Sequence, residues 1–193
     1  MSFAHSIFWT FYQKTNISWP VSSFTWHIGR CKMDEELDKL TYEDVKNAAS
    51  AFGGAIKHTP TNQSITLSKI TGSELYLKLE NSQFTASFKE RGALNKLLNL
   101  SPEQKNKGVI AASAGNHAQG VAFHGSRLGI PTTIAMPLGT PFVKISNTEE
   151  FGAKVVQIGE RFDETAEEAL KIAKKEGLTV VHPFDDYRVM AGQ

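Results

Sequence analysis

From residue 109 onward, short apolar runs alternate with longer amphipathic runs. The apolar runs predict β-strands over residues 109–112, 132–136, 154–158 and 179–181. The amphipathic runs predict helices over residues 116–128, 142–151 and 163–176. Each predicted helix is followed by a glycine that can form its left-handed C-cap, namely Gly129, Gly152 and Gly177. Because strands and helices alternate, we predict an α/β fold in which helices cover both faces of a parallel sheet.

Before residue 109 the pattern is less regular. A helix is predicted over residues 41–52, because Thr41 and Asp44 can form a capping box at its start. A short helical turn at residues 67–70 and a strand at residues 75–79 follow. The first and last predicted helices each have an expected buried face, formed by Val45, Ala48, Ala49 and Phe52 and by Ala166, Ala169, Leu170 and Ala173 respectively.

The composition is that of a soluble globular protein, with 40% hydrophobic and 21% charged residues among 193. The net charge of +1 gives no reason to expect a nucleic acid or a membrane surface as a partner. No apolar run approaches the ~20 residues that span a bilayer. Cys31 is the only cysteine, so no disulfide can form within the chain. This fits a reducing compartment, and we expect a cytoplasmic location.

Residues 1–32 differ from the rest of the chain. They contain no Asp or Glu, and they hold all three tryptophans. Such a segment could be a targeting sequence, which would make the protein organellar. The alternative that we favour is a lineage-specific extension or a start assigned too early, because Met33 and the three acidic residues after it look like a natural beginning. We expect this extension to be poorly ordered.

A first candidate motif is SFKERGA at residues 87–93, which we call the lysine segment. Ser87 and Glu90 have the spacing of a capping box at the start of a helix. Lys89 then falls in the first helical turn, where the helix dipole disfavours a cation and should lower the pKa of the amine. A neutral amine is what Schiff-base chemistry needs. The alternative is an ordinary solvated surface lysine.

A second candidate motif is SAGNH at residues 113–117, between a predicted strand and a predicted helix. A loop of small residues at a helix N-terminus presents backbone N–H groups to an anion. Ser113 and Asn116 add side-chain donors. Ligands of open parallel sheets bind at the carboxyl ends of strands, which is where this loop lies. Taken alone, the motif is better read as an ordinary strand-to-helix turn.

Together the two motifs resemble the threonine dehydratase and serine racemase branch of the fold-type II (tryptophan synthase beta-like) pyridoxal-phosphate enzymes. The resemblance runs from about Met33 to Gln193, and it includes KLEN at residues 78–81, HPFD at residues 182–185 and AGQ at residues 191–193. It implies a division into the first part of a large domain with the lysine segment (residues 33–107), a small α/β domain (residues 108–182) and the start of the return to the large domain (residues 183–193).

The family also has a Gly-rich loop that holds the phosphate of the cofactor, and no such tetrapeptide is present in this sequence. We therefore expect the chain to cover about the first half of such an enzyme. A non-catalytic fragment, or an interaction module derived from the enzyme, is the alternative. The family further implies a homo-oligomer for the full-length enzyme.

The resemblance also implies roles for individual residues. Lys89 forms the Schiff base with pyridoxal 5′-phosphate and then takes the Cα proton of the substrate. Phe88 lies against the pyridine ring, although it could equally be a core phenylalanine, and Asn116 donates to the 3′ oxygen of the cofactor. The carboxylate of the substrate is expected to bind the second motif, which consists of Ser113, Ala114, Gly115, Asn116 and His117. His117 could instead cap the helix, and no metal is implied.

Two positions depart from the patterns of the family. Racemases of this branch have a second serine, which acts as acid or base on the opposite face of the substrate, where this chain has Ala114. Since alanine cannot return a proton, loss of the β-hydroxyl is favoured. L-threonine would then give 2-oxobutanoate and ammonia, and L-serine would be a second substrate. This favours a threonine/serine dehydratase (ammonia-lyase), with a serine racemase-like enzyme as the alternative. The other departure is Ala86, where the family often has glycine.

Overall fold

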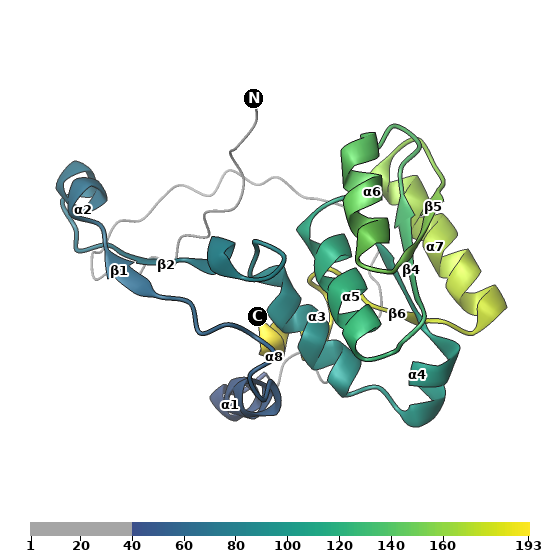
Figure 1. Cartoon of the computed structure of the whole chain (residues 1–193), viewed down its shortest axis with the longest axis horizontal. Coiled ribbons are helices and arrows are strands. Elements are labelled where there is room, and N and C mark those ends of the chain that lie inside the picture. The colour runs from purple at the N-terminus through teal and green to yellow at the C-terminus, as the bar shows by residue number, and fades with distance from the viewer. Residues whose placement is uncertain (1–39) are drawn as a thin grey trace, which may run out of the picture.

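The structure is a computed structural model that describes residues 40–193 (Figure 1). The predicted extension over residues 1–32 lies outside the described residues. Within residues 40–193, no helix is both long and apolar enough to cross a membrane.

A four-stranded parallel sheet forms the centre of the C-terminal part of the chain, in the order β5-β4-β3-β6. Its strands are β3 (Val109–Ala112), β4 (Thr132–Met136), β5 (Lys154–Gln157) and β6 (Thr179–Val180). The predicted parallel sheet is therefore confirmed. β3 and β4 have the predicted bounds, while β5 and β6 each end one residue earlier than predicted.

Helices cover both faces of this sheet, as predicted (Figure 1). They are α5 (Asn116–Arg127) and α6 (Phe142–Glu150) on one face and α7 (Phe162–Glu176) on the other. Side chains of successive strand residues point to opposite faces. Ile134 of β4 therefore packs in the cluster with Val121 of α5, whereas its neighbour Ala135 packs in the cluster with Ala169 of α7.

The buried face of α7 differs in part from the prediction. Ala169 and Ala173 are buried against the sheet. Leu170, which was predicted to be buried, is 57% exposed. At about 100° per residue, Leu170 lies to the side of the Ala169–Ala173 stripe, and the partly buried Ile172 packs against the sheet in its place.

The N-terminal part begins with α1 (Tyr42–Ala51), whose predicted capping box is confirmed. The Asp44 N–H donates to Thr41 Oγ1 over 3.3 Å, and the Thr41 N–H donates to Asp44 Oδ2 over 2.9 Å. Of the predicted apolar face only Ala48 is buried, and Val45 is exposed.

A hairpin then extends away from the sheet, with a helix between its strands (Figure 1). Its elements are β1 (Thr61–Gln63), α2 (Ile65–Thr71) and the antiparallel β2 (Tyr76–Lys78), which leads into the 3-10 turn η2 (Glu80–Ser82). β1 was not predicted because it is wholly polar.

Helix α3 (Lys89–Leu98) starts within the lysine segment and packs between α5 and α8 (Tyr187–Gly192) (Figure 1). It is followed by the short α4 (Pro102–Lys107), and neither α4 nor α8 was predicted. The crossing of α3 and α8 is very close, because Gly92 and Gly192 face each other there. A Cβ on Gly92 would lie 2.7 Å from the carbonyl oxygen of Val189, so the backbones approach to a distance that only glycine allows.

Candidate active site

An open cleft of about 1950 Å³ lies between the N-terminal part of the chain and the N-terminus of α5. Most of the residues that the sequence suggested for the site line it, namely Phe88, Lys89, Ala114, Gly115 and Asn116. Ser113 and His117 are not among the lining residues. The structure thus brings the lysine segment and the centre of the second motif together. The roles assigned to these residues stay predictions.

Lys89 is the first residue of α3, and its side chain is half-buried. Its Nζ donates a hydrogen bond to the carbonyl oxygen of Pro183 over 2.7 Å. Burial lowers the pKa of the Lys89 amine. The direction is the one predicted from the sequence, but the cause is the loss of solvent rather than the helix dipole. The site therefore disfavours the charged ammonium.

The capping box predicted for Ser87 and Glu90 is wrong. Ser87 Oγ accepts a hydrogen bond from the Lys89 N–H over 3.2 Å, but the N-cap of α3 is Phe88. The carboxylate of Glu90 does not return to Ser87. Its Oε2 accepts from Thr85, over 2.8 Å from the backbone N–H and 2.7 Å from Oγ1. Because the helix begins one residue later than predicted, the side chain of Glu90 reaches the preceding turn instead.

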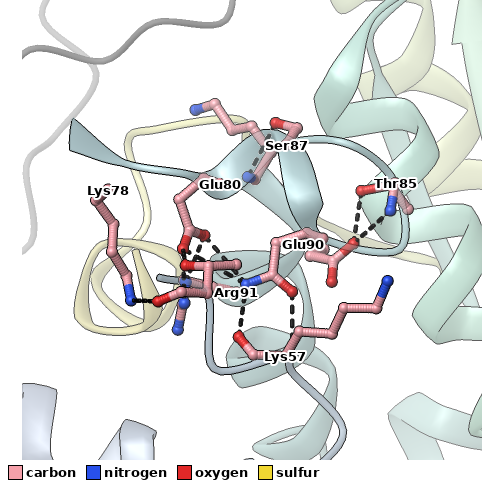
Figure 2. A network of polar contacts seen from close by, with 10 residues as sticks. Lys57, Lys78, Glu80, Thr85, Ser87, Glu90 and Arg91 are labelled. Carbon is pink, nitrogen blue, oxygen red and sulfur yellow. Dashed lines mark hydrogen bonds and ion pairs between the residues drawn. The ribbon is translucent and has the colours of Figure 1, made fainter. Parts of the chain in front are cut away.

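Arg91 holds the lysine segment on its other side, through an ion pair with Glu80 (Figure 2). Its Nε and Nη2 donate to the two carboxylate oxygens of Glu80 over 2.7 and 2.8 Å. Thr59 Oγ1 also donates to Glu80 Oε1, over 2.5 Å. Burial raises the pKa of Glu80, but the hydrogen bonds from Arg91 and Thr59 outweigh burial, so the pKa of this carboxyl lies below its usual range.

Sequence reasoning quoted Glu80 and Arg91 within motifs but missed that they pair. A partly buried, two-pronged pair of this kind fixes orientation as well as charge. Lys78 and Gln83 extend the network, because they donate hydrogen bonds to the backbone carbonyls of Thr59 and Lys57 respectively.

The second motif forms the turn between β3 and α5. Ser113 Oγ accepts a hydrogen bond from the Gly115 N–H over 3.2 Å, so this hydroxyl stabilises the turn. Ala114, Gly115 and Asn116 face the cleft at the N-terminus of α5. The first N–H groups of a helix have no partner within the helix, and they favour an anion placed there. The cleft thus combines an amine with an anion-binding helix end.

His117 points away from the cleft. Its ring is buried, and Nε2 lies 2.9 Å from the carbonyl oxygen of Val181 in the turn after β6. Burial lowers the pKa of His117 to about 4, a hydrogen bond to Val181 opposes the change, and the nearby charge of Lys89 adds to it. A neutral ring that donates to a backbone carbonyl has a structural role. The alternative of a helix-capping role is not seen either, because the N-cap of α5 is Gly115 and no side chain caps this helix.

The segment after β6 was missed by sequence reasoning as part of the site. It supplies Pro183, whose carbonyl holds Lys89, and His182, whose Nδ1 accepts from the Asp185 N–H over 2.8 Å. Burial also lowers the pKa of His182. The HPFD motif at residues 182–185 was the available signal, because the resemblance includes it but implies no role for its residues. Among residues 40–193 no group of three or more His, Cys, Asp or Glu could hold a metal ion.

Comparisons with known proteins show which proteins the chain resembles. The chain is 50% identical over 154 residues to the L-threonine ammonia-lyase of Thermotoga maritima. This match covers 80% of this chain and 38% of that protein. Among solved structures, the processed form of threonine deaminase isoform 2 from Solanum lycopersicum is 41% identical, with a TM-score of 0.73, covering 78% of this chain and 42% of that one.

Serine racemase from Dictyostelium discoideum is 31% identical, with a TM-score of 0.73, covering 79% of this chain and 50% of that one. The chain spans about two fifths of the length of the curated relatives that it matches. A sequence model of the family described as "Pyridoxal-phosphate dependent enzyme" matches residues 53–193. This match covers most of the chain and includes both motifs of the cleft, so the chain belongs to the family of pyridoxal-phosphate dependent enzymes.

Proposed function

We propose that the chain supplies the lysine-bearing part of the active site of a threonine/serine ammonia-lyase. The observation that carries the proposal is the position of Lys89, which lines one cleft together with the N-terminus of α5 and whose amine has a pKa lowered by burial. The names of the Thermotoga maritima and Solanum lycopersicum relatives support the choice of threonine as substrate.

The residues of the cleft fit the aldehyde and the ring of pyridoxal phosphate. Lys89, Phe88 and Asn116 would hold it, because they offer an amine, an aromatic ring and an amide around one open volume. When bound, the cofactor supplies an aldehyde for the lysine and an electron sink for the substrate's Cα.

Lys89 Nζ would also act as a base. Burial lowers the pKa of the Lys89 amine, and a base that takes the Cα proton of an amino acid must first be free of its own proton. The carbonyl of Pro183 accepts from the same nitrogen and orients it. The N-terminus of α5 would fix the carboxylate of the substrate, since its backbone N–H groups favour an anion.

Ala114 decides between elimination and racemisation. It lies in the cleft, and its methyl group cannot return a proton to the opposite face of the substrate. Loss of the β-hydroxyl as water therefore follows removal of the Cα proton, and hydrolysis of the resulting enamine gives a 2-oxo acid and ammonia. From L-threonine the 2-oxo acid is 2-oxobutanoate. We expect Ala114→Ser in the full-length enzyme to raise racemisation relative to elimination.

Two further predictions complete the proposal. We propose that the full-length enzyme is a homo-oligomer, which light scattering coupled to size-exclusion chromatography would test. We also propose a cytoplasmic location, which microscopy of the tagged protein would test.

The decisive experiment is reductive trapping. The 193-residue chain is incubated with low concentrations of pyridoxal phosphate and reduced with borohydride, and the modified lysine is located by mass spectrometry. We expect selective labelling of Lys89, abolished by Lys89→Ala and unchanged by Lys69→Ala on the exposed face of α2. Labelling spread over many lysines, or none, would instead favour a non-catalytic fragment or interaction module.

A further inference from the structure

A buried carboxylate lies directly beside Lys89 along the chain. Glu90 is 0% exposed, and its Oε2 accepts both of the hydrogen bonds that Thr85 can donate, from the backbone N–H and from Oγ1. Figure 2 shows the side chain of Glu90 turned toward Thr85, while that of Arg91 extends to Glu80. Burying a carboxylate is unfavourable unless hydrogen bonds compensate it. Glu90 therefore acts on the turn that precedes the helix.

That turn contains an unusual backbone conformation. Ala86 has φ +53°, and among residues 40–193 it is the only residue other than glycine with a positive φ. Side chains of L-amino acids rarely adopt this left-handed region. The turn is closed by a hydrogen bond from the Ala86 N–H to the Gln83 carbonyl over 3.1 Å. Such conformations persist only where the surrounding contacts hold them, and the bonds from Thr85 to Glu90 span this one.

The backbone of α3 at Lys89 is held on other sides as well. Arg91 binds Glu80. Gly120 of α5 approaches so closely that a Cβ there would lie 3.0 Å from Glu90 Cα and 3.3 Å from the Lys89 carbonyl carbon. With the helix fixed by these contacts, the course of residues 85–87 sets the position of Phe88, whose ring centroid lies 5.3 Å from Lys89 Nζ.

We propose that Glu90 is a positioning residue for Lys89, acting through Thr85 to hold the left-handed turn that places Phe88 beside the lysine amine. The inference rests on the proposed function, in which Lys89 is the reacting amine. A pure volume-filling role would require no acceptor, whereas Thr85 presents two donors to a single oxygen of Glu90. The other oxygen, Oε1, has no hydrogen-bond partner among the described residues. The proposal therefore assigns the positioning of Lys89 to the acceptor oxygen Oε2 rather than to the charge.

The test measures the pH profile of Lys89 without cofactor, so a failure of the proposed function does not affect it. The full chain is labelled with trace acetic anhydride from pH 6 to 11, and modification of Lys89 is quantified by mass spectrometry. The exposed Lys174 of α7 in the same digest serves as the reference. Accessibility changes the plateau of such a profile, whereas a change in pKa moves its midpoint.

Glu90→Ala removes the acceptor, so the turn should open, water should reach Lys89 and its midpoint should move to higher pH. Glu90→Gln keeps a carbonyl oxygen for Thr85 and should leave the midpoint in place. A direct effect of the charge predicts the opposite pattern, because loss of a nearby anion would lower the midpoint in Glu90→Gln. Adding Ala86→Gly to Glu90→Ala should return the midpoint part of the way, since glycine adopts the left-handed conformation readily.

Glu103→Gln is the matched control, because Glu103 is an exposed carboxylate in the first turn of α4. This variant should leave the Lys89 midpoint unchanged. The proposal is overturned if folded Glu90→Ala has the midpoint of the parent chain, or if Ala86→Gly restores nothing. Should Glu90→Ala fail to fold, Thr85→Val removes one of the two hydrogen bonds and Thr85→Ser retains it. An unchanged Lys89 midpoint in Thr85→Val would then overturn the proposal.

Discussion

The sheet unit, residues 109–181, and the lysine segment with the turn before it, residues 83–93, are held by different contacts. In the sheet unit the fully buried side chains are mainly aliphatic, such as Ile110 and Ile134, and they pack on both faces of a parallel ladder. Within residues 83–90 all four buried residues are polar or charged, namely Gln83, Thr85, Ser87 and Glu90. The first region depends on apolar burial, and the second depends on specific hydrogen bonds and close backbone contacts.

This difference has a functional consequence. Apolar packing tolerates exchange of one aliphatic side chain for another of similar volume. Hydrogen bonds between buried groups have narrow geometric limits, and an unmade bond is costly. An amine that must face a substrate is better fixed by the second kind of contact. The comparison therefore predicts that small changes near Lys89 lower the free energy of unfolding more than small changes at the surface of the sheet unit do.

The largest expected effect is at the crossing of α3 and α8. In Gly92→Ala the new methyl group would lie 2.7 Å from the Val189 carbonyl oxygen, a backbone atom that cannot turn aside as a side chain can. Despite the better helix propensity of alanine, we expect overpacking to lower the free energy of unfolding by about 3 kcal/mol. Urea denaturation followed by circular dichroism measures this change.

Gly139→Ala is the matched control, because a Cβ at Gly139 meets nothing within 4 Å. It should change the free energy of unfolding by less than about 0.5 kcal/mol. If the two variants were equally stable, the close contact between α3 and α8 would be irrelevant to folding, and the contrast between the two regions would lose its main support.

A second prediction concerns acid stability and uses a buried histidine of α5. His124 is 0% exposed, neither ring nitrogen has a hydrogen-bond partner among the described residues, and burial together with the charge of Arg127 lowers its pKa to about 4. Unfolding restores an ordinary pKa of about 6.5, so between these values the unfolded chain binds the proton more strongly. Above pH 6.5 the free energy of unfolding is therefore unaffected by this group. As the pH falls to 5, uptake of the proton by the unfolded chain lowers the free energy of unfolding by about 2 kcal/mol.

His124→Leu should remove this share of the loss, while the similar share of His117 remains. The measurement is urea denaturation at pH 7.5 and pH 5 for the parent chain and for His124→Leu. His58→Gln, which changes an exposed histidine, serves as the control. If His124→Leu lost as much stability as the parent chain on acidification, the buried ring would not be the source of the pH dependence.

The regular elements of the sheet unit could be predicted from the sequence because their signals are local. β3 and β4 are apolar runs bounded by turn residues, and their bounds match the prediction. β1 was missed because its residues are polar and only pairing with β2 makes it a strand.

The contacts around Lys89 could not be predicted in the same way. Arg91 and Glu80 are 11 residues apart, and Lys89 is 94 residues from Pro183. Such partners depend on the folded chain and leave no periodic pattern. Even the short-range pair predicted there, Ser87 with Glu90, was wrong, because Thr85 offers the carboxylate two donors.

The smallest expected effect concerns Leu170, which was predicted to be buried and is exposed. Leu170 is 57% exposed on α7, so Leu170→Ala removes little buried surface and should lower the free energy of unfolding by less than about 0.5 kcal/mol. Ile172, two residues further along, packs against the sheet, and Ile172→Ala should cost about 2 kcal/mol. Parallel urea denaturation of the two variants separates them. The reverse order would mean that α7 is rotated toward the face predicted from the sequence, and apolar periodicity would then place side chains as reliably as it places the helices themselves.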